Sequence, residues 1–323
     1  MRPFKRPLDG ILLNLSISES GENEALGLPE WQVNRFTLQM VVALFGQGAG
    51  VVFGHDWRSQ GVMATVHLFA QQLQPVEPLA EGSADSSRLP LLHNVLAWPD
   101  QTSVSQTELR RLSGSLRVYE AELPQSLRHI PALHSPMWNR YVRARALTHM
   151  RRRLNSLAQA RLCIGGRTTG SQGRYPGVIE EALLAVTDRK PLFLAGMLGG
   201  AARQVIDAIE QRPLPEDFCH RRRSANDPDP TEELQRVYDE FRLLEAPAGI
   251  RNLADDLSVE PVAVWETFQR LKVGGISESN RLTATENQEL FHTPIPERAI
   301  ELVLLGLGRL RGSTRPANSS TVA

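Results

Sequence analysis

Short apolar runs alternate with segments of helical periodicity along the first 75 residues. The run at 10–17 (GILLNLSI) is followed, after a polar loop, by a segment from Pro29 in which apolar residues recur every three or four positions. A second run at 50–54 (GVVFG) precedes another helical segment from Gly61 to about Leu73. Because each strand is apolar throughout, this β, α, β, α order favours parallel strands that are covered on both faces.

The same alternation continues through the middle of the chain. Strands are expected at 89–98, 116–123, 162–164 and 191–195, and helices at 137–160 and 200–210. These elements predict an α/β fold, a Rossmann-like and mostly parallel sheet with helices on both faces. Right-handed crossovers put the C-terminal ends of the strands on one edge, where ligands bind in such folds.

The last third of the chain begins polar and turn-rich and then becomes helical. We expect a nucleotide-ligand-binding domain at 8–211, a small C-terminal helical appendage at 212–311 and a disordered tail at 312–323. Helices within the appendage are expected at 231–244, 261–271 and 296–307.

Composition and charge exclude several classes of function. Basic and acidic residues number 36 each, so net charge gives no reason to expect a polyanion or an anionic membrane as partner. No apolar run approaches the roughly 20 residues that cross a bilayer, and we expect a cytoplasmic protein without a membrane partner. Cys163, Cys219 and the scattered histidines lack metal-ligand spacing, which predicts no metal. Serine-hydrolase and Walker motifs are absent from the sequence.

Glycine-rich junctions follow three of the expected strands. The richest runs from Cys163 to Leu183 (CIGGRTTGSQGRYPGVIEEAL) and leads through Pro176 into a helix. Unpaired N–H groups and the helix dipole can bind a phosphate there, and Arg167 and Arg174 can add charge-assisted bonds. The other junctions contain Gly196, Gly199 and Gly200, and Gly54 and Gly61. Three such junctions favour ligand binding, although glycine also ends strands and helices for local reasons.

Charged residues flank the richest junction on both sides. Glu180 and Glu181 fall in the first helical turn, where the helix dipole favours carboxylates even without a function. As functional groups, they would bind ribose hydroxyls or act on an N-glycosidic bond. The expected helix at 137–160 contains Arg140, Arg143, Arg145, Arg151, Arg152 and Arg153. Such a group is typical of a solvated face or a polyanion patch, and we expect part of its charge to meet phosphate.

With these residues, the segment from Thr148 to Gly200 resembles the SLOG superfamily, which contains the Lonely Guy phosphoribohydrolases, the Smf/DprA proteins and the TRPM-type sensing domains. The correspondence to the family motifs M-x-x-R-K, P-G-G-x-G-T-x-x-E and K-P runs through Arg151, Arg152, Gly165, Gly166, Gly177, Glu181, Lys190 and Pro191. The stretches ISES and VVFGHD are also similar to the first strands of bacterial SLOG sensors, with Gly54 and Gly61 as ligand-loop glycines.

The sequence departs from the phosphoribohydrolase motif at three places. Val178 replaces the threonine, Ile164 replaces the proline before the paired glycines, and residues 168–175 expand the loop. The resemblance therefore implies sensing of a nucleotide-derived ligand, of the kind proposed for bacterial conflict and antiphage systems, more than cytokinin-type chemistry.

Three functions follow from these observations. The leading hypothesis is a ligand-binding module that recognises an NAD- or ADP-ribose-type nucleotide or a nucleoside phosphate and regulates an effector protein, as a homo-oligomer and without a cofactor. The enzymatic alternative hydrolyses an N-glycosidic bond, with Glu181 stabilising the developing cation and Arg151 holding the 5′-phosphate. DprA-like nucleic-acid binding is the third, and the neutral charge and few aromatic residues count against it.

The residues expected to bind the ligand share positions at strand ends or on the helices that meet them. They are Gly54, Gly61, Arg151, Arg152, Gly165, Gly166, Arg167, Gly177, Glu180, Glu181, Gly196, Gly199 and Gly200.

Overall fold

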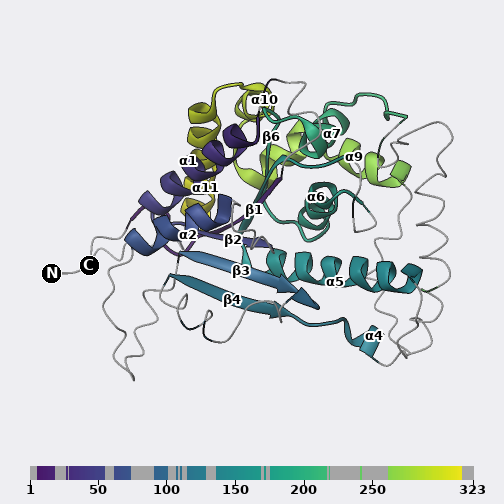
Figure 1. Ribbon diagram of the computed structural model, residues 1–323. Coiled ribbons are helices and arrows are strands. Elements are labelled where there is room, and N and C mark those ends of the chain that lie inside the picture. The colour runs from purple at the N-terminus through teal and green to yellow at the C-terminus, as the bar shows by residue number, and fades with distance from the viewer. Residues whose placement is uncertain are drawn as a thin grey trace, which may run out of the picture.

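The structure is a computed structural model, and it describes residues 6–18, 27, 29–54, 62–73, 91–100, 107, 110, 115–128, 136–168, 171, 175–216, 218, 241 and 261–314. Six strands of this part of the chain form one sheet (Figure 1). They are β1 Leu12–Ser18, β2 Gly50–Gly54, β3 Leu92–Ala97, β4 Leu116–Ala121, β5 Ala160–Gly165 and β6 Leu192–Ala195. Their spatial order is β4-β3-β2-β1-β5-β6, and every neighbouring pair is parallel. The predicted Rossmann-like α/β fold is confirmed.

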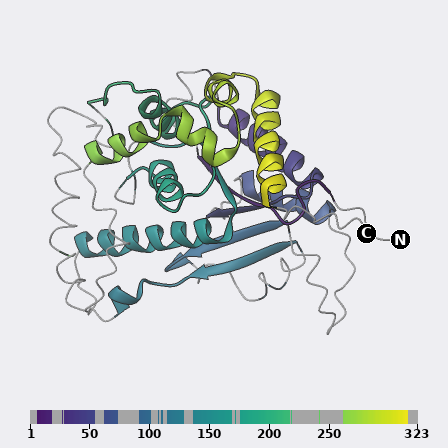
Figure 2. The ribbon, with the colours of Figure 1, turned by 180° about the vertical axis from the view of Figure 1, so that it is seen from behind.

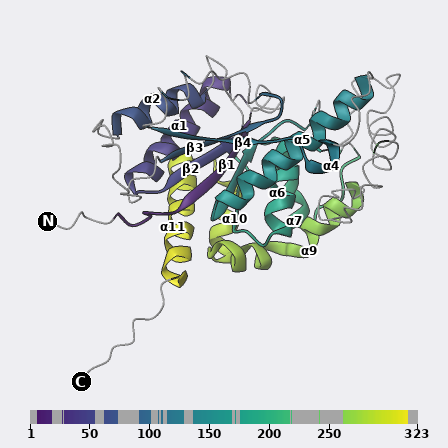
Figure 3. The ribbon, with the colours of Figure 1, turned by 90° about the horizontal axis from the view of Figure 1, so that it is seen from below.

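Helices cover both faces of the sheet. They are α1 Glu30–Gly46, α2 Val62–Leu73, α4 Gln125–Arg128, α5 Pro136–Leu157, α6 Gly177–Thr187, α7 Gly200–Ile209, α9 Pro261–Asn280, α10 Ala284–His292 and α11 Pro296–Thr314. One face carries α1, α2 and α11, and the other carries α5, α6 and α7, with α9 packed on α7 (Figure 3). No described helix is both long and apolar enough to cross a membrane.

The central strand β1 presents a different chemistry to each face. Leu13 and Leu15 enter the hydrophobic cluster that includes α1 and α11. Because side chains alternate along a strand, Asn14 and Ser16 face α5 and α6, and both are buried. The face under α5 and α6 therefore contains a buried polar layer in the middle of an otherwise apolar core.

The C-terminal helices pack directly against the sheet region (Figure 2). Phe268 of α9 and Phe291 of α10 share a buried cluster with α6 and α7, and Val303 of α11 joins the cluster around β1. The backbone of α11 at Gly306 lies close to the ring of Phe193 on β6. A Cβ at Gly306 would lie 2.4 Å from Cε1 of Phe193. Apolar packing of this kind fixes α11 on the sheet.

The observed helices differ from the predicted ones at the C-terminal end. Beyond the predicted helix at 261–271, α9 continues to Asn280 across a non-helical residue, Lys272, with φ 50° and ψ 177°. The sequence reasoning missed α10 altogether, and α11 extends to Thr314, inside the tail predicted at 312–323. The predicted helix at 231–244 lies outside the described residues apart from Phe241.

Candidate functional site

The candidate site lies at the C-terminal edge of the sheet between β1 and β5. The strand order reverses there, since the chain lays β2, β3 and β4 on one side of β1 and then β5 and β6 on the other. Ligands of open α/β sheets bind at such a switch point. The backbone N–H of Gly166 donates to the carbonyl of Ser18 over 2.8 Å, which ties the ends of the two strands together.

Two glycines allow the chain to leave β5 and turn into the loop before α6. Gly165 and Gly166 have φ of +60° and +97°, values that L side chains rarely adopt. A Cβ on Gly165 would lie 2.7 Å from the carbonyl oxygen of Ser18, and one on Gly166 would lie 2.6 Å from Cγ2 of Val178. The paired glycines therefore let α6 pack closely against the strand end, and Val178 occupies the space beside them.

The junction between β6 and α7 is closed by backbone contacts. A Cβ on Gly196 would lie 2.3 Å from the carbonyl oxygen of Phe291, and the N–H of Ala201 donates to the carbonyl of Gly166 over 2.9 Å. Gly199 and Gly200, with φ of 60° and 64°, make the turn into α7. Gly196 therefore meets a packing requirement, and Gly199 and Gly200 meet a backbone requirement of the turn.

The third predicted junction is described only at its first residue. At the end of β2, a Cβ on Gly54 would lie 2.9 Å from Cε of Met150 on α5. Strand β2 and helix α5 therefore pack closely at Gly54. Gly61 lies outside the described residues, as do Gly170, Gly173 and Arg174 of the β5–α6 loop.

Four charged side chains meet beneath the start of α6. In this buried quartet, Arg151 of α5 bonds Oε2 of Glu180 through Nη1 at 2.5 Å and Oε1 of Glu181 through Nε at 3.4 Å. Arg161 of β5 bonds Oε2 of Glu181 through Nη1 at 2.9 Å. Arg161 and Glu180 are fully buried, and the side chains of Arg151 and Glu181 are 10% and 14% exposed. The two positive and two negative charges balance one another.

Neutral side chains complete the hydrogen bonding of the quartet. The hydroxyl of Thr148 donates to Oε1 of Glu180 over 2.5 Å, and Nη1 of Arg161 also donates to Ser16 Oγ over 2.7 Å. Asn155 accepts from Nη2 of Arg161 at 3.4 Å and donates to Asp188 at the end of α6 over 2.6 Å. Glu180 is thus bonded at both oxygens and shielded from solvent, which makes it a structural carboxylate.

The guanidinium of Arg151 reaches the N-terminus of α6. Its Nη2 lies 2.8 Å from the position that a Cβ on Gly177 would take, and it has no hydrogen-bond partner among the described residues. Burial opposes the charge of Arg151, but Glu180 and Glu181 outweigh this effect and raise the pKa of the guanidinium above its ordinary value. A permanently charged N–H donor therefore sits beside the unpaired N–H groups and positive dipole end of a helix.

The remaining predicted arginines are spread over other surroundings. Arg152 follows on α5 and is half-buried, and Arg167 is exposed after the paired glycines. Arg143 donates to the carbonyl of Trp98, and Arg153 lies over the ring of Tyr119 with 5.7 Å from Cζ to the ring centroid. Arg143 and Arg153 therefore contact different parts of the chain.

The sequence reasoning missed Arg161, which is a member of the quartet, and its neighbours Ser16 and Asn14 on β1. One signal was present, because an arginine next to the apolar residues 162–164 is unusual in a strand covered on both faces. Cys163 lies beside them in register with Ser16, and burial raises the pKa of its thiol to about 12. The thiol is therefore not a nucleophile near neutral pH.

The chain matches a protein-family model over most of its length. The family described as SLOG cluster2 matches residues 7–290, which include the sheet, the buried quartet, α9 and most of α10. Among curated proteins, none matches the chain.

Proposed function

This chain belongs to the SLOG cluster2 family, and we propose that it binds a nucleotide-derived ligand of the NAD, ADP-ribose or nucleoside-phosphate type at the β1–β5 edge. Membership of the SLOG family is consistent with nucleotide-related binding or with glycosidic activity. Within this proposal, ligand binding regulates an effector protein of a bacterial conflict or signalling system.

The observation that carries the proposal is the position of Arg151 Nη2 at the start of α6. A phosphate at this point would accept from the guanidinium and from backbone N–H groups of the first turn, and it would meet the positive end of the helix dipole. The absence of a side chain at Gly177 keeps this approach open, because a Cβ there would lie 2.8 Å from Nη2. Within the proposal, exposed Arg167 adds positive charge from the loop after the paired glycines.

The state of Glu181 favours binding over hydrolysis. A carboxylate that stabilises an oxocarbenium ion needs an oxygen free to approach the sugar. Here Oε1 accepts from Arg151 and Oε2 accepts from Arg161, and the side chain is 14% exposed. Ribose hydroxyls can still donate to this carboxylate, since each oxygen has two lone pairs. Glu181 is therefore better suited to hold a ribose than to cleave its glycosidic bond.

Isothermal titration calorimetry with ADP-ribose, cyclic ADP-ribose isomers, NAD and AMP tests the proposal. We expect at least one of these nucleotides to bind. Gly177→Ala should weaken the affinity for that nucleotide by about 10- to 100-fold, because the new methyl group displaces Nη2 of Arg151 from the site. Gly308→Ala is the matched control, since a Cβ there meets nothing within 4 Å. No binding across the panel, or equal affinity in both variants, would contradict the proposal.

Hydrolysis is tested on the same ligands by chromatography for released base. Binding without turnover is the expected result. Release of nicotinamide or adenine that disappears in Glu181→Gln would instead establish the glycosidase.

A further inference from the structure

Arg161 is a fully buried arginine in the second position of a central strand, with a relative exposure of 0%. Removing an arginine from water is costly, and an apolar residue of similar size at such a position is often neutral or stabilising. The sequence of β5 otherwise consists of small or apolar residues, ALCIG. The role of this arginine therefore depends on the groups that it contacts.

Some buried polar atoms of Arg161 and its neighbour Asn14 have no hydrogen-bond partner in the described part of the chain. One of them is Nε of Arg161. Asn14, which lies opposite Arg161 in the β1–β5 ladder, likewise leaves both its amide nitrogen and its oxygen without a partner among the described residues. Each unsatisfied buried group costs free energy, so this layer is not arranged for maximum stability.

The bonds that Arg161 does make lead to the candidate site. Its Nη1 holds Glu181 Oε2 at 2.9 Å, and the same nitrogen is anchored on Ser16 of β1 at 2.7 Å. The second oxygen of Glu181 accepts from Nε of Arg151 at 3.4 Å. A chain of contacts therefore runs from the rigid centre of the sheet to the guanidinium beneath Gly177.

We propose that Arg161 is the positioning residue of the anion site. It fixes the carboxylate of Glu181, and Glu181 in turn orients the guanidinium of Arg151 so that Nη2 lies at the start of α6. This inference rests on the proposed function, because it explains how the ligand-contacting arginine is held. Charge alone would not suffice, since Arg151 could pair with Glu180 in other orientations of its planar group.

A double-mutant cycle tests the relay, with ADP-ribose titrated into the wild type, Arg161→Met, Glu181→Gln and the double variant. If Arg161 acts through Glu181, Arg161→Met weakens binding by about 10- to 100-fold in the wild-type background. In the Glu181→Gln background, the same change has an effect of less than about twofold. Equal losses in both backgrounds, or no loss in either, would overturn the proposal. A purely structural role for Arg161 would lower the melting temperature without this non-additivity.

Arg161→Met leaves Glu181 without one of its two buried partners, so the single variant can fail to fold. Arg161→Lys keeps a positive charge, but a lysine cannot bond Ser16, Glu181 and Asn155 together. If Arg161→Met does not fold, Arg161→Lys takes its place in the same double-mutant cycle. The predicted pattern is unchanged, with a smaller loss in the wild-type background.

A readout without ligand separates this inference from the proposed function. The side-chain Nε–H of Arg151, observed by NMR, should exchange slowly with solvent in the wild type because it donates to Glu181. We expect Arg161→Met and Arg161→Lys to accelerate this exchange, even if none of the nucleotides binds. Unchanged exchange in both variants would overturn the positioning role, whereas failure of every titration would contradict the proposed function alone.

Discussion

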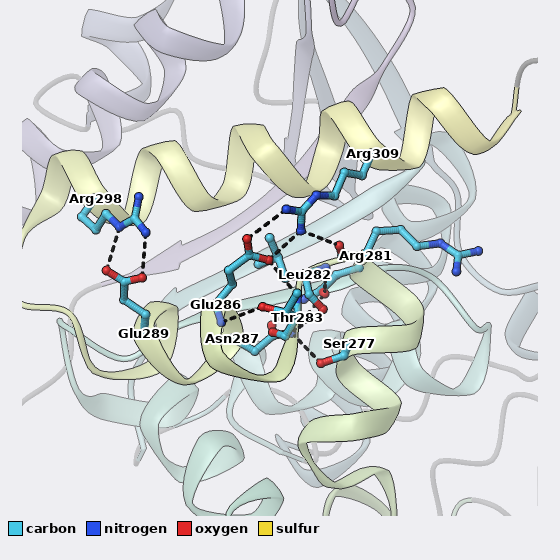
Figure 4. Close-up of polar contacts among 10 residues, drawn as sticks. Ser277, Arg281, Leu282, Thr283, Glu286, Asn287, Glu289, Arg298 and Arg309 are labelled. Carbon is cyan, nitrogen blue, oxygen red and sulfur yellow. Dashed lines mark hydrogen bonds and ion pairs between the residues drawn. The ribbon is translucent and has the colours of Figure 1, made fainter.

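Two groups of arginine–glutamate pairs in this protein differ in where their charges lie. The buried quartet lies between β5, α5 and α6, with its arginine side chains 10% and 0% exposed. The second group joins α10 to α11, where Arg298 bonds Glu289 at 2.7 Å and Arg309 bonds Glu286 at 2.6 Å (Figure 4). Their arginine side chains are about four times as exposed as that of Arg151, at 39% and 40%.

The difference in burial indicates different roles for the two groups. The exposed pairs attach α10 to α11, whereas the buried quartet belongs to the candidate site. Exposed pairs cost little to form and contribute little, because water already solvates both partners. Buried pairs require desolvation of both charges, and removal of one partner leaves the other uncompensated. The α10–α11 pairs need no explanation beyond helix attachment, whereas the buried quartet is a costly arrangement beside a helix N-terminus and a strand switch point.

The largest expected effect is on the buried quartet. Glu180→Gln removes the main carboxylate partner of Arg151 and should lower the free energy of unfolding by about 3–5 kcal/mol. Glu289→Gln, which makes the same chemical change in an exposed pair, should change it little. Denaturant titrations of the two variants compare them directly, and losses of equal size would remove the distinction between the two groups.

A smaller effect is expected where α11 packs on the sheet. Gly306→Ala puts a methyl group 2.4 Å from Cε1 of Phe193 and 2.9 Å from the carbonyl of Asn280 and should destabilise the fold by about 1–3 kcal/mol. Gly308→Ala, on the same helix but facing open space, should stabilise it by up to about 1 kcal/mol through helix propensity. Thermal unfolding distinguishes them. If both Gly306→Ala and Gly308→Ala destabilised the protein, close packing at Gly306 would not explain how α11 is held on the sheet.

The smallest expected effect concerns the pH dependence of the exposed group. Hydrogen bonds from Arg309, together with the backbone N–H of Thr283, lower the pKa of Glu286 from 4.5 to about 2. The unfolded chain therefore takes up a proton at a higher pH than the folded chain does. This contribution to stability is present above about pH 4.5 and is lost as the pH falls to about 2.

Glu286→Gln removes the titrating group and should cost about 1 kcal/mol or less at pH 7. Melting temperatures of this variant and the wild type, measured between pH 7 and pH 2.5, should converge at the acid end. A gap that stays constant over this range would show that the Glu286 carboxylate does not stabilise the fold through its charge.

Most of the sheet could be predicted because several of its strands are mainly apolar runs. The run at 10–17 and the run at 50–54 correspond to β1 and β2, since strands buried on both faces are mainly apolar. Asn14 and Ser16 of β1 are buried exceptions to this rule. Strand order could not be predicted in the same way, because it depends on contacts between distant segments. The helix α10 was missed since its buried apolar residues, Leu290 and Phe291, lie at its end, although the Thr283–Glu286 capping box was present in the sequence.

The candidate site was predictable only in part. Arg151, Gly177, Glu180 and Glu181 were selected from local motifs, and the structure brings them together. Arg161 could not be assigned a role from its neighbours in sequence, because Ser16 lies 145 positions away and Glu181 lies 20 positions away. Local sequence patterns predict helix starts and turns. The role of a buried charged residue depends on partners that only the folded chain brings next to it.

A crystal structure of the protein with ADP-ribose is the most direct test of the central claim. The account predicts a phosphate oxygen within hydrogen-bonding distance of Arg151 Nη2 and of a backbone N–H in the first turn of α6. A ligand bound elsewhere on the chain, with Nη2 of Arg151 making no contact to it, would contradict the account.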